Sequence, residues 1–183
     1  MRTRTLAALA LTALSMLVAL PGGANASSTA RTGALLDRGC DPIAPAACLL
    51  PFPDDWFTVA DPRTATGRRI HLGALATPRN VLGKPIDPTE WNRSDGFSPG
   101  SMLLAHVPGV DLGRTGAAPI TDIGRSLRAD APIVLVDTAT GERWPYWAEL
   151  DANATTPERQ ALIVRPARNL REGHRYAVAL RGL

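Results

Sequence analysis

The chain has 183 residues, of which 45% are hydrophobic, and this is enough to bury one core in a domain of ordinary size. Its formal net charge is +3, and its arginines are scattered among acidic residues. This composition gives no electrostatic case for binding nucleic acid or acidic lipid, because both need clustered positive charge.

The first 26 residues have the three parts of a secretory signal peptide. Met1 to Arg4 is short and basic, Leu6 to Leu20 is almost unbroken apolar sequence, and Ala24 to Ala26 forms an A-x-A cleavage site. A membrane anchor would need a longer run of about 20 apolar residues. We therefore expect cleavage after Ala26, which removes two arginines and no acid and so takes the formal charge from +3 to +1. The product is expected outside the cytoplasm, without a transmembrane segment.

The exported part is predicted to begin with a flexible leader and a disulfide. Residues 27–39 are small and polar and show no periodicity, whereas residues 40–183 are expected to form a single β-rich domain. Cys40 and Cys48 flank a loop that contains proline. Outside the cytoplasm such a pair is most simply a disulfide, and two thiols are too few for a four-ligand zinc site.

Between the cysteines and residue 101 the sequence is rich in proline and turn signals. Proline lacks a backbone N–H, so Leu49 to Pro53 is expected to run along a sheet edge or as an extended lead-in. Asp87 can cap a helix and Pro88 fits its first position, which predicts one or two helical turns. Two short β-prone runs predict a hairpin with a long turn, formed by Trp56 to Val59 and Arg69 to Leu72.

From residue 102 onward the sequence predicts a series of short strands. These runs recur at spacings of about ten residues without alternating helices, which predicts a mainly β, Ig-like antiparallel sandwich with long Pro/Gly-rich loops and one short helix. A small-residue loop is expected from Gly113 to Pro119. The expected strands are Met102 to Val107, Pro132 to Val136, Arg143 to Leu150 (with Pro145 marking an edge), Ala161 to Val164, and Tyr176 to Leu180.

The link between the last two expected strands is predicted to form a structural corner. Leu170, Gly173 and Tyr176 fall three apart in this link. Their spacing suggests a tyrosine corner, in which a tyrosine at the start of a strand of a β-sandwich bonds back to backbone a few residues upstream. We interpret it as architecture and not as a binding or catalytic site.

One catalytic pattern is present, and its context argues against it. Gly96 to Gly100 fits G-x-S-x-G, which in α/β-hydrolases places a serine on a strand-to-helix turn beside an oxyanion hole. Pro99 follows Ser98 and has no N–H to contribute to that hole. The residues before Ser98 are polar and turn-rich, and not a buried strand.

The other residues with catalytic or metal-binding chemistry are dispersed. His71, His106 and His174 lie far apart, and no H-x-H or H-E-x-x-H spacing links them. We therefore expect no catalytic residue, no metal site and no cofactor in this chain.

A cluster of aromatic residues offers an alternative function. Strands that present aromatic faces hold glycans in sugar-binding modules, and Trp144, Tyr146 and Trp147 lie within one expected strand. Alternation puts Trp144 and Tyr146 on one face and Trp147 on the other, so at least one face is expected in the core. Because aromatic residues make up 5% of the chain, we favour core packing over a glycan platform.

Three segments together carry a resemblance to a known family. They are LPFPDDWF (Leu50 to Phe57), DGFSPGS (Asp95 to Ser101) and LIVRPARNLREGHRYAVALRGL (Leu162 to Leu183). In combination they resemble the N-terminal domain of bacterial virulence-factor lipases, which follows a signal peptide and precedes an α/β-hydrolase domain. The cysteine pair is not part of that family's pattern.

The resemblance implies a non-catalytic role, because the nucleophile of such enzymes lies in the later domain. We expect the chain to be the N-terminal part, or a remnant, of an exported hydrolase that packs on a catalytic domain or contacts the cell envelope. The alternative is a glycan- or envelope-binding module that uses Trp144, Tyr146 and Trp147. An autonomous serine hydrolase that uses Ser98 ranks last.

Overall fold

The fold is that of a computed structural model, in which residues 39–183 are described. The predicted signal peptide, residues 1–26, and residues 27–38 of the predicted leader lie outside the described residues. The described part is mainly β, as predicted, with strands in antiparallel sheets and short helical segments. In this part of the chain no helix combines the length and the hydropathy needed to cross a bilayer.

The first described segment contains the disulfide and a small hairpin. Cys40 and Cys48 are joined by a disulfide, as predicted. The predicted hairpin is also present, as β1 (Thr58–Ala60) paired antiparallel with β2 (Arg68–Ile70). Trp56 was expected in the first strand and instead lies in a 3-10 turn, η1 (Asp55–Phe57), because the Asp54 carboxylate accepts a hydrogen bond of 2.6 Å from its N–H.

The helical content differs from the prediction of one short helix. Asp87 does not cap a helix: its carboxylate accepts from the N–H and hydroxyl of Thr89 and closes a turn. Part of the loop expected at Gly113 to Pro119 is helical, because the Asp111 side chain caps the N–H groups of Gly113 and Arg114. Besides η1, the helical segments are η2 (Trp91–Arg93), α2 (Leu112–Thr115), η3 (Ile120–Leu127) and η4 (Pro157–Arg159).

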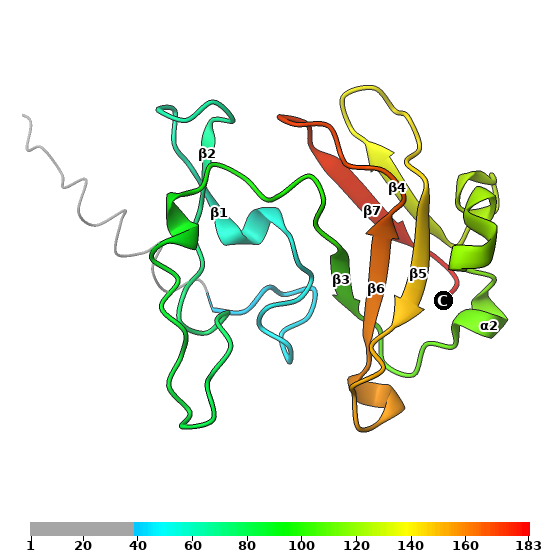
Figure 1. Ribbon diagram of the computed structural model, residues 1–183, viewed down its shortest axis with the longest axis horizontal. Coiled ribbons are helices and arrows are strands. Elements are labelled where there is room, and N and C mark those ends of the chain that lie inside the picture. Colours follow the sequence, from blue (N-terminus) through cyan, green and yellow to red (C-terminus); the bar gives the residue numbers. More distant parts are fainter. Residues whose placement is uncertain (1–38) are drawn as a thin grey trace, which may run out of the picture.

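Two further antiparallel sheets are built from the later strands (Figure 1). One has the order β3-β6-β5 and contains β3 (Leu103–His106), β6 (Ala161–Pro166) and β5 (Tyr146–Leu150). The other pairs β4 (Ile133–Asp137) with β7 (Tyr176–Leu180). The last two predicted strands, β6 and β7, therefore belong to different sheets.

The chain also passes from one sheet to the other at Pro145. Arg143 bridges Val136, and the Trp144 N–H donates to the Leu135 carbonyl at 2.7 Å, so residues 143–144 run beside β4. From Tyr146 onward the chain pairs with β6. The predicted strand Arg143 to Leu150 is thus divided at Pro145, which cannot donate a ladder hydrogen bond.

Side chains from both sheets and from the α2–η3 segment share one core. Tyr146, Ile133, Leu135 and Leu162 are almost fully inaccessible to solvent. In β5 and β6, buried and partly exposed residues alternate, as the period-2 geometry of strands requires. The buried cluster consists of Ala117, Ala118, Ile133, Leu135, Trp144, Tyr146, Ala148, Leu162 and Val164.

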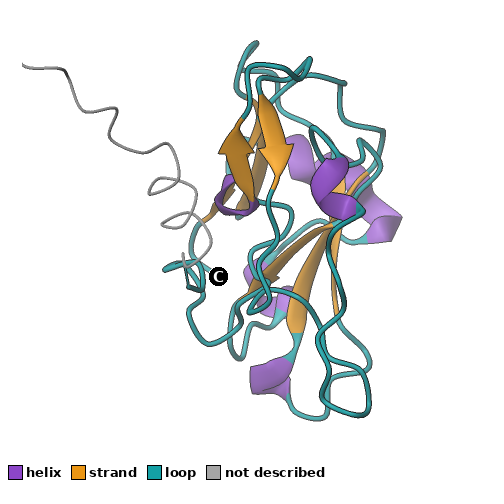
Figure 2. Cartoon of the chain, turned by 90° about the vertical axis from the view of Figure 1, so that its left-hand side faces the viewer, coloured by secondary structure: helices purple, strands orange, loops and turns teal. Residues whose placement is uncertain are grey.

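Contacts tie the loop-rich first part to the strands. Figure 2 shows the loops that surround the β1–β2 hairpin. The backbone of Phe52 exchanges two hydrogen bonds with Leu104 of β3, at 2.9 and 2.6 Å. An ion pair joins Asp55 of η1 to Arg175, the residue before β7. The turn at residues 93–98 is held beside the hairpin by other bonds: the Ile70 N–H donates to the Ser94 carbonyl at 2.9 Å, and the Arg69 guanidinium donates to the Arg93 carbonyl at 2.6 Å.

Candidate functional site

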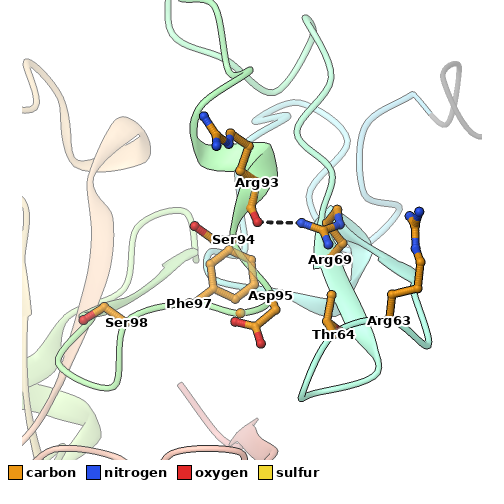
Figure 3. Close-up of a pocket in the computed structure, with 9 residues that line it drawn as sticks. Arg63, Thr64, Arg69, Arg93, Ser94, Asp95, Phe97 and Ser98 are labelled. Carbon is orange, nitrogen blue, oxygen red and sulfur yellow. Dashed lines mark hydrogen bonds between the residues drawn. The ribbon is translucent and has the colours of Figure 1, made fainter.

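A cleft lies between the β1–β2 hairpin and the turn at residues 93–98 (Figure 3). Its volume is about 620 Å³. The Thr66 hydroxyl donates to the Asp95 carbonyl and closes one side. The lining is mostly polar and consists of Arg63, Thr64, Arg69, Arg93, Ser94, Asp95, Gly96, Phe97 and Ser98.

The positive charges around the cleft are largely compensated. The buried carboxylate of Asp61 accepts from Arg63 at 2.8 and 3.0 Å and from Arg69 at 2.8 Å. The hydrogen bonds from Arg63, and then those from Arg69, hold the pKa of Asp61 far below its usual range. Arg93 pairs with Glu90 at 3.1 Å. The cleft can therefore offer guanidinium and hydroxyl groups to a polar ligand, but it has no strong excess of charge.

Ser98 lines this cleft as part of a turn. Its hydroxyl accepts from the Gly100 N–H at 3.3 Å, and its carbonyl accepts from the Ser101 N–H at 3.0 Å. The strand β3 follows this turn and does not precede it, so the strand-to-helix geometry of a nucleophile elbow is not formed. Within residues 39–183 no histidine hydrogen-bonds to Ser98. The turn instead supports the later corner, because the Pro99 carbonyl accepts from the Leu170 N–H at 2.9 Å.

The aromatic residues proposed as a glycan platform are divided between core and surface. Trp144 and Tyr146 lie in the same buried cluster, although Pro145 divides the predicted strand between them, and they are 2% and 0% exposed. The Trp144 indole N–H donates to the Arg168 carbonyl at 3.1 Å, and the Tyr146 hydroxyl donates to the Ile133 carbonyl at 2.7 Å. Burial raises the pKa of Tyr146 to about 12. These two rings are packing residues, so they cannot offer a face to a sugar in this fold.

Trp147 lies on the other face of β5, opposite Arg165 of β6. Its indole nitrogen is buried without a hydrogen-bond partner among the described residues. Arg165 is held by Glu149 at 2.5 Å on the same face. Of the three aromatic residues, Trp147 alone lies outside the buried cluster, and it lies beside the Arg165–Glu149 ion pair.

The corner residues lie where β7 begins. The Tyr176 hydroxyl accepts a hydrogen bond of 2.9 Å from the N–H of Arg171, five residues upstream. Gly173 has a φ of +70°, which residues with a side chain rarely adopt. Leu170 packs against the core cluster. This is the geometry that a tyrosine corner requires.

Replacing Tyr176 by phenylalanine tests the contribution of that bond. The ring can keep its edge-on contact with Trp144, at 5.3 Å between centroids, but the Arg171 N–H loses its acceptor. We expect the free energy of unfolding to fall by about 1–2 kcal/mol, measured by urea denaturation. Tyr146→Phe is the matched control, since its hydroxyl also bonds to backbone. A cost for Tyr146→Phe with none for Tyr176→Phe would show that the corner bond is dispensable.

The structure adds a buried charge cluster that the sequence did not indicate. Asp137, at the end of β4, is fully buried and accepts from Arg171 at 2.7 Å and from His174 Nδ1 at 2.8 Å. Arg171 also pairs with Glu142 at 2.5 Å. Burial alone would raise the pKa of Asp137, but the hydrogen bonds from Arg171, the Ala139 N–H and His174 outweigh it and lower the pKa to about 2.

This cluster locks the corner onto the core. The guanidinium carbons of Arg168 and Arg171 lie 3.7 and 4.8 Å from the centroid of the Trp144 ring, within cation–π range. A His–Asp pair can orient a catalytic base, but among residues 39–183 no hydroxyl or thiol hydrogen-bonds to His174. Across the same residues there is no group of acidic, histidine or cysteine side chains that could hold a metal ion. The contacts that the cluster does make join the segment at residues 168–174 to the end of β4 and to Trp144.

Strand β7 carries the other unusual feature, an apolar surface. From Ala177 to Leu180 every residue is exposed, including Val178 at 44% and Leu180 at 39%. Thr138 N–H donates to the Arg175 carbonyl and Arg181 N–H donates to Pro132, so alternate backbone groups of β7 face β4 and the others face away. No strand of the described part pairs with that outer edge.

Comparison of the chain with protein-family models, with curated proteins and with solved structures found no match.

Proposed function

We propose that this chain is an exported, non-catalytic module of the Ig-like sandwich type, which packs β7 against a second protein domain. The observation that carries the proposal is the apolar strand β7, which is exposed from Ala177 to Leu180 and unpaired along one edge. Natural proteins protect edge strands with charge, proline or bulges, and YAVAL has none of these. A partner domain would cover both the edge and the apolar side chains.

Several features support the Ig-like assignment. Two antiparallel sheets, β3-β6-β5 and β4-β7, contribute to one core. The chain changes sheet at Pro145 and again between β6 and β7, as in sandwiches with crossed connections. The hydrogen bond from the Arg171 N–H to the Tyr176 hydroxyl adds the corner that this class of fold uses.

Export is supported by the signal-like N-terminus and by the Cys40–Cys48 disulfide. A non-catalytic role is supported by the turn geometry of Ser98, to which no histidine of residues 39–183 hydrogen-bonds. The three segments that resemble the N-terminal domain of virulence-factor lipases suggest an α/β-hydrolase domain as the partner. The glycan-binding alternative loses support, because Trp144 and Tyr146 are buried.

Site-specific cross-linking tests the partner. A photoreactive amino acid at position 178, in the chain expressed in its native host, is expected to cross-link to a domain with an α/β-hydrolase sequence. The same amino acid at Thr155, which is exposed in the loop before η4, is the control and should give no such product. Cross-linking of position 178 to a second copy of the chain, or of both positions to the same proteins, would overturn the proposal.

An activity measurement tests the non-catalytic part separately. The purified chain is expected to hydrolyse no short-chain p-nitrophenyl ester and to take no label from a fluorophosphonate. Esterase activity that disappears in Ser98→Ala would establish a serine hydrolase instead.

A further inference from the structure

A rigid hairpin at residues 78–86 presents two aliphatic side chains to solvent. The Ile86 N–H donates to the Pro78 carbonyl at 2.9 Å, and the Asn80 N–H donates to the Lys84 carbonyl at 2.9 Å. The Asn80 side chain accepts from the N–H groups of Leu82 and Lys84, both at 3.0 Å. The hairpin projects away from the strands β3 to β7 (Figure 1).

The tip of this hairpin carries the most exposed apolar side chains of the described chain. Val81 is fully exposed, and Leu82 is 87% exposed. Gly83 has a φ of +74° and closes the turn, and its carbonyl accepts from the Arg79 guanidinium at 2.7 Å. Because the backbone of the tip is hydrogen-bonded on both sides, the two aliphatic side chains are held outward and do not fold back on the protein.

Positive charge surrounds the aliphatic pair. Arg79 and Lys84 flank it, both are exposed, and no acidic residue occurs from residue 78 to residue 86. The nearest acid in the sequence is Asp87, whose carboxylate accepts from the N–H and hydroxyl of Thr89 and also interacts electrostatically with Lys84. Two cations beside an aliphatic tip match a surface with negative headgroups above an apolar layer.

We propose that residues 79–84 form a tip that inserts into anionic phospholipid bilayers. A protein partner is a poorer match, because two side chains on a narrow hairpin supply far less than the roughly 800 Å² per partner of a stable interface. The chain as a whole lacks clustered positive charge, and Arg79 and Lys84 alone would not hold it on a membrane, so Val81 and Leu82 must supply most of the affinity. Binding is therefore weak, reversible and sensitive to salt. The proposed export decides only which membrane the tip would meet; the inference depends on the proposed function in no other way.

Vesicle co-sedimentation tests this inference. The chain purified after export is mixed at low salt with vesicles of phosphatidylglycerol and phosphatidylethanolamine, and in parallel with vesicles of phosphatidylcholine. We expect binding to the anionic vesicles and a reduction on the order of tenfold for the double variant V81D/L82D. Lys84→Gln should weaken binding less, and added salt should weaken it in the wild type. The double variant should keep the wild-type thermal midpoint, since both side chains are solvated in the folded chain.

The control variant is Ile120→Asp, which alters another exposed apolar side chain, 64% exposed in η3, and should leave vesicle binding unchanged. All variants share the same N-terminal residues, so these contribute equally to each measurement. Equal sedimentation of wild type and V81D/L82D, or absence of binding to anionic vesicles, would overturn the inference. Neither result bears on the cross-linking at position 178, so this inference and the proposed function can fail separately.

Discussion

Replacing Asp137 by asparagine is expected to destabilise the folded chain strongly at neutral pH. The carboxylate is fully buried and is shared by Arg171 and His174. Asparagine keeps the shape and can still accept from the Ala139 N–H, but it carries no charge to balance the guanidinium. Removing one partner of a buried ion pair leaves the other uncompensated, which is why such changes are among the most damaging polar substitutions.

The same substitution is expected to change the response to acid. The pKa of Asp137 is about 2 in the folded chain, below the ordinary value of 3.8. A lowered pKa means that the stabilisation is complete above about pH 4 and is lost as the pH falls toward 2. The stability difference between wild type and Asp137→Asn should therefore be large at pH 7 and shrink across that acidic range.

Urea denaturation at several pH values between 2 and 7 provides the measurement. Asp130→Asn is the control, because Asp130 pairs with Arg128 at 3.1 Å but its side chain is mostly exposed, and exposed pairs contribute little. A stability difference between wild type and Asp137→Asn that stays the same at every pH would mean that side-chain shape, and not charge, makes Asp137 important.

Truncation of Leu162 to alanine is expected to cost about 2–5 kcal/mol of unfolding free energy. Leu162 is fully buried in β6, between β3 and β5, and its removal leaves a cavity among well-packed neighbours. Val178→Ala on β7 is the informative comparison, since a substitution on the surface changes stability by about 0.5 kcal/mol or less. Chemical denaturation of both variants at pH 7 measures the difference.

The comparison of Leu162→Ala with Val178→Ala also tests whether β7 is free to bind a partner domain. If the isolated chain loses little when Val178 is truncated, the apolar side chains of β7 are available to a partner domain. An equally large loss for Val178→Ala would show that β7 already packs within this chain, and the proposed docking surface would have to be abandoned.

The strands could be predicted because their signal is local. Apolar runs bounded by proline and glycine gave β4, β6 and β7 to within two residues, since each needs only its own pattern to be recognised. The short helices were harder to predict from the sequence. Asp111 and Gly116 do mark the ends of α2, but η3 has no comparable local signal, and the Ser126 hydroxyl is fixed from outside by the Tyr146 N–H.

The charge cluster could not be predicted, because its members are distant in sequence. Asp137 reads as the first residue of a polar turn, and Arg171 follows 34 positions later. Nothing local distinguishes Arg171 from the other arginines, and only the register of β4 with β7 brings the two together. For the same reason, alternation could assign Trp144 and Tyr146 to one face but could not say which face is the core.

The pairing of β4 with β7 also constrains when the chain can fold. Asp137 lies opposite Tyr176, and Ile133 lies opposite Leu180, so the ladder along this edge of β4 cannot form until β7 has been synthesised. Pairings between distant segments form slowly, because the loop between them must close first. A growing chain therefore remains incompletely folded through the synthesis of residues 138–175. Under the export proposed above, this delay would keep the nascent polypeptide extended for passage through a translocation channel.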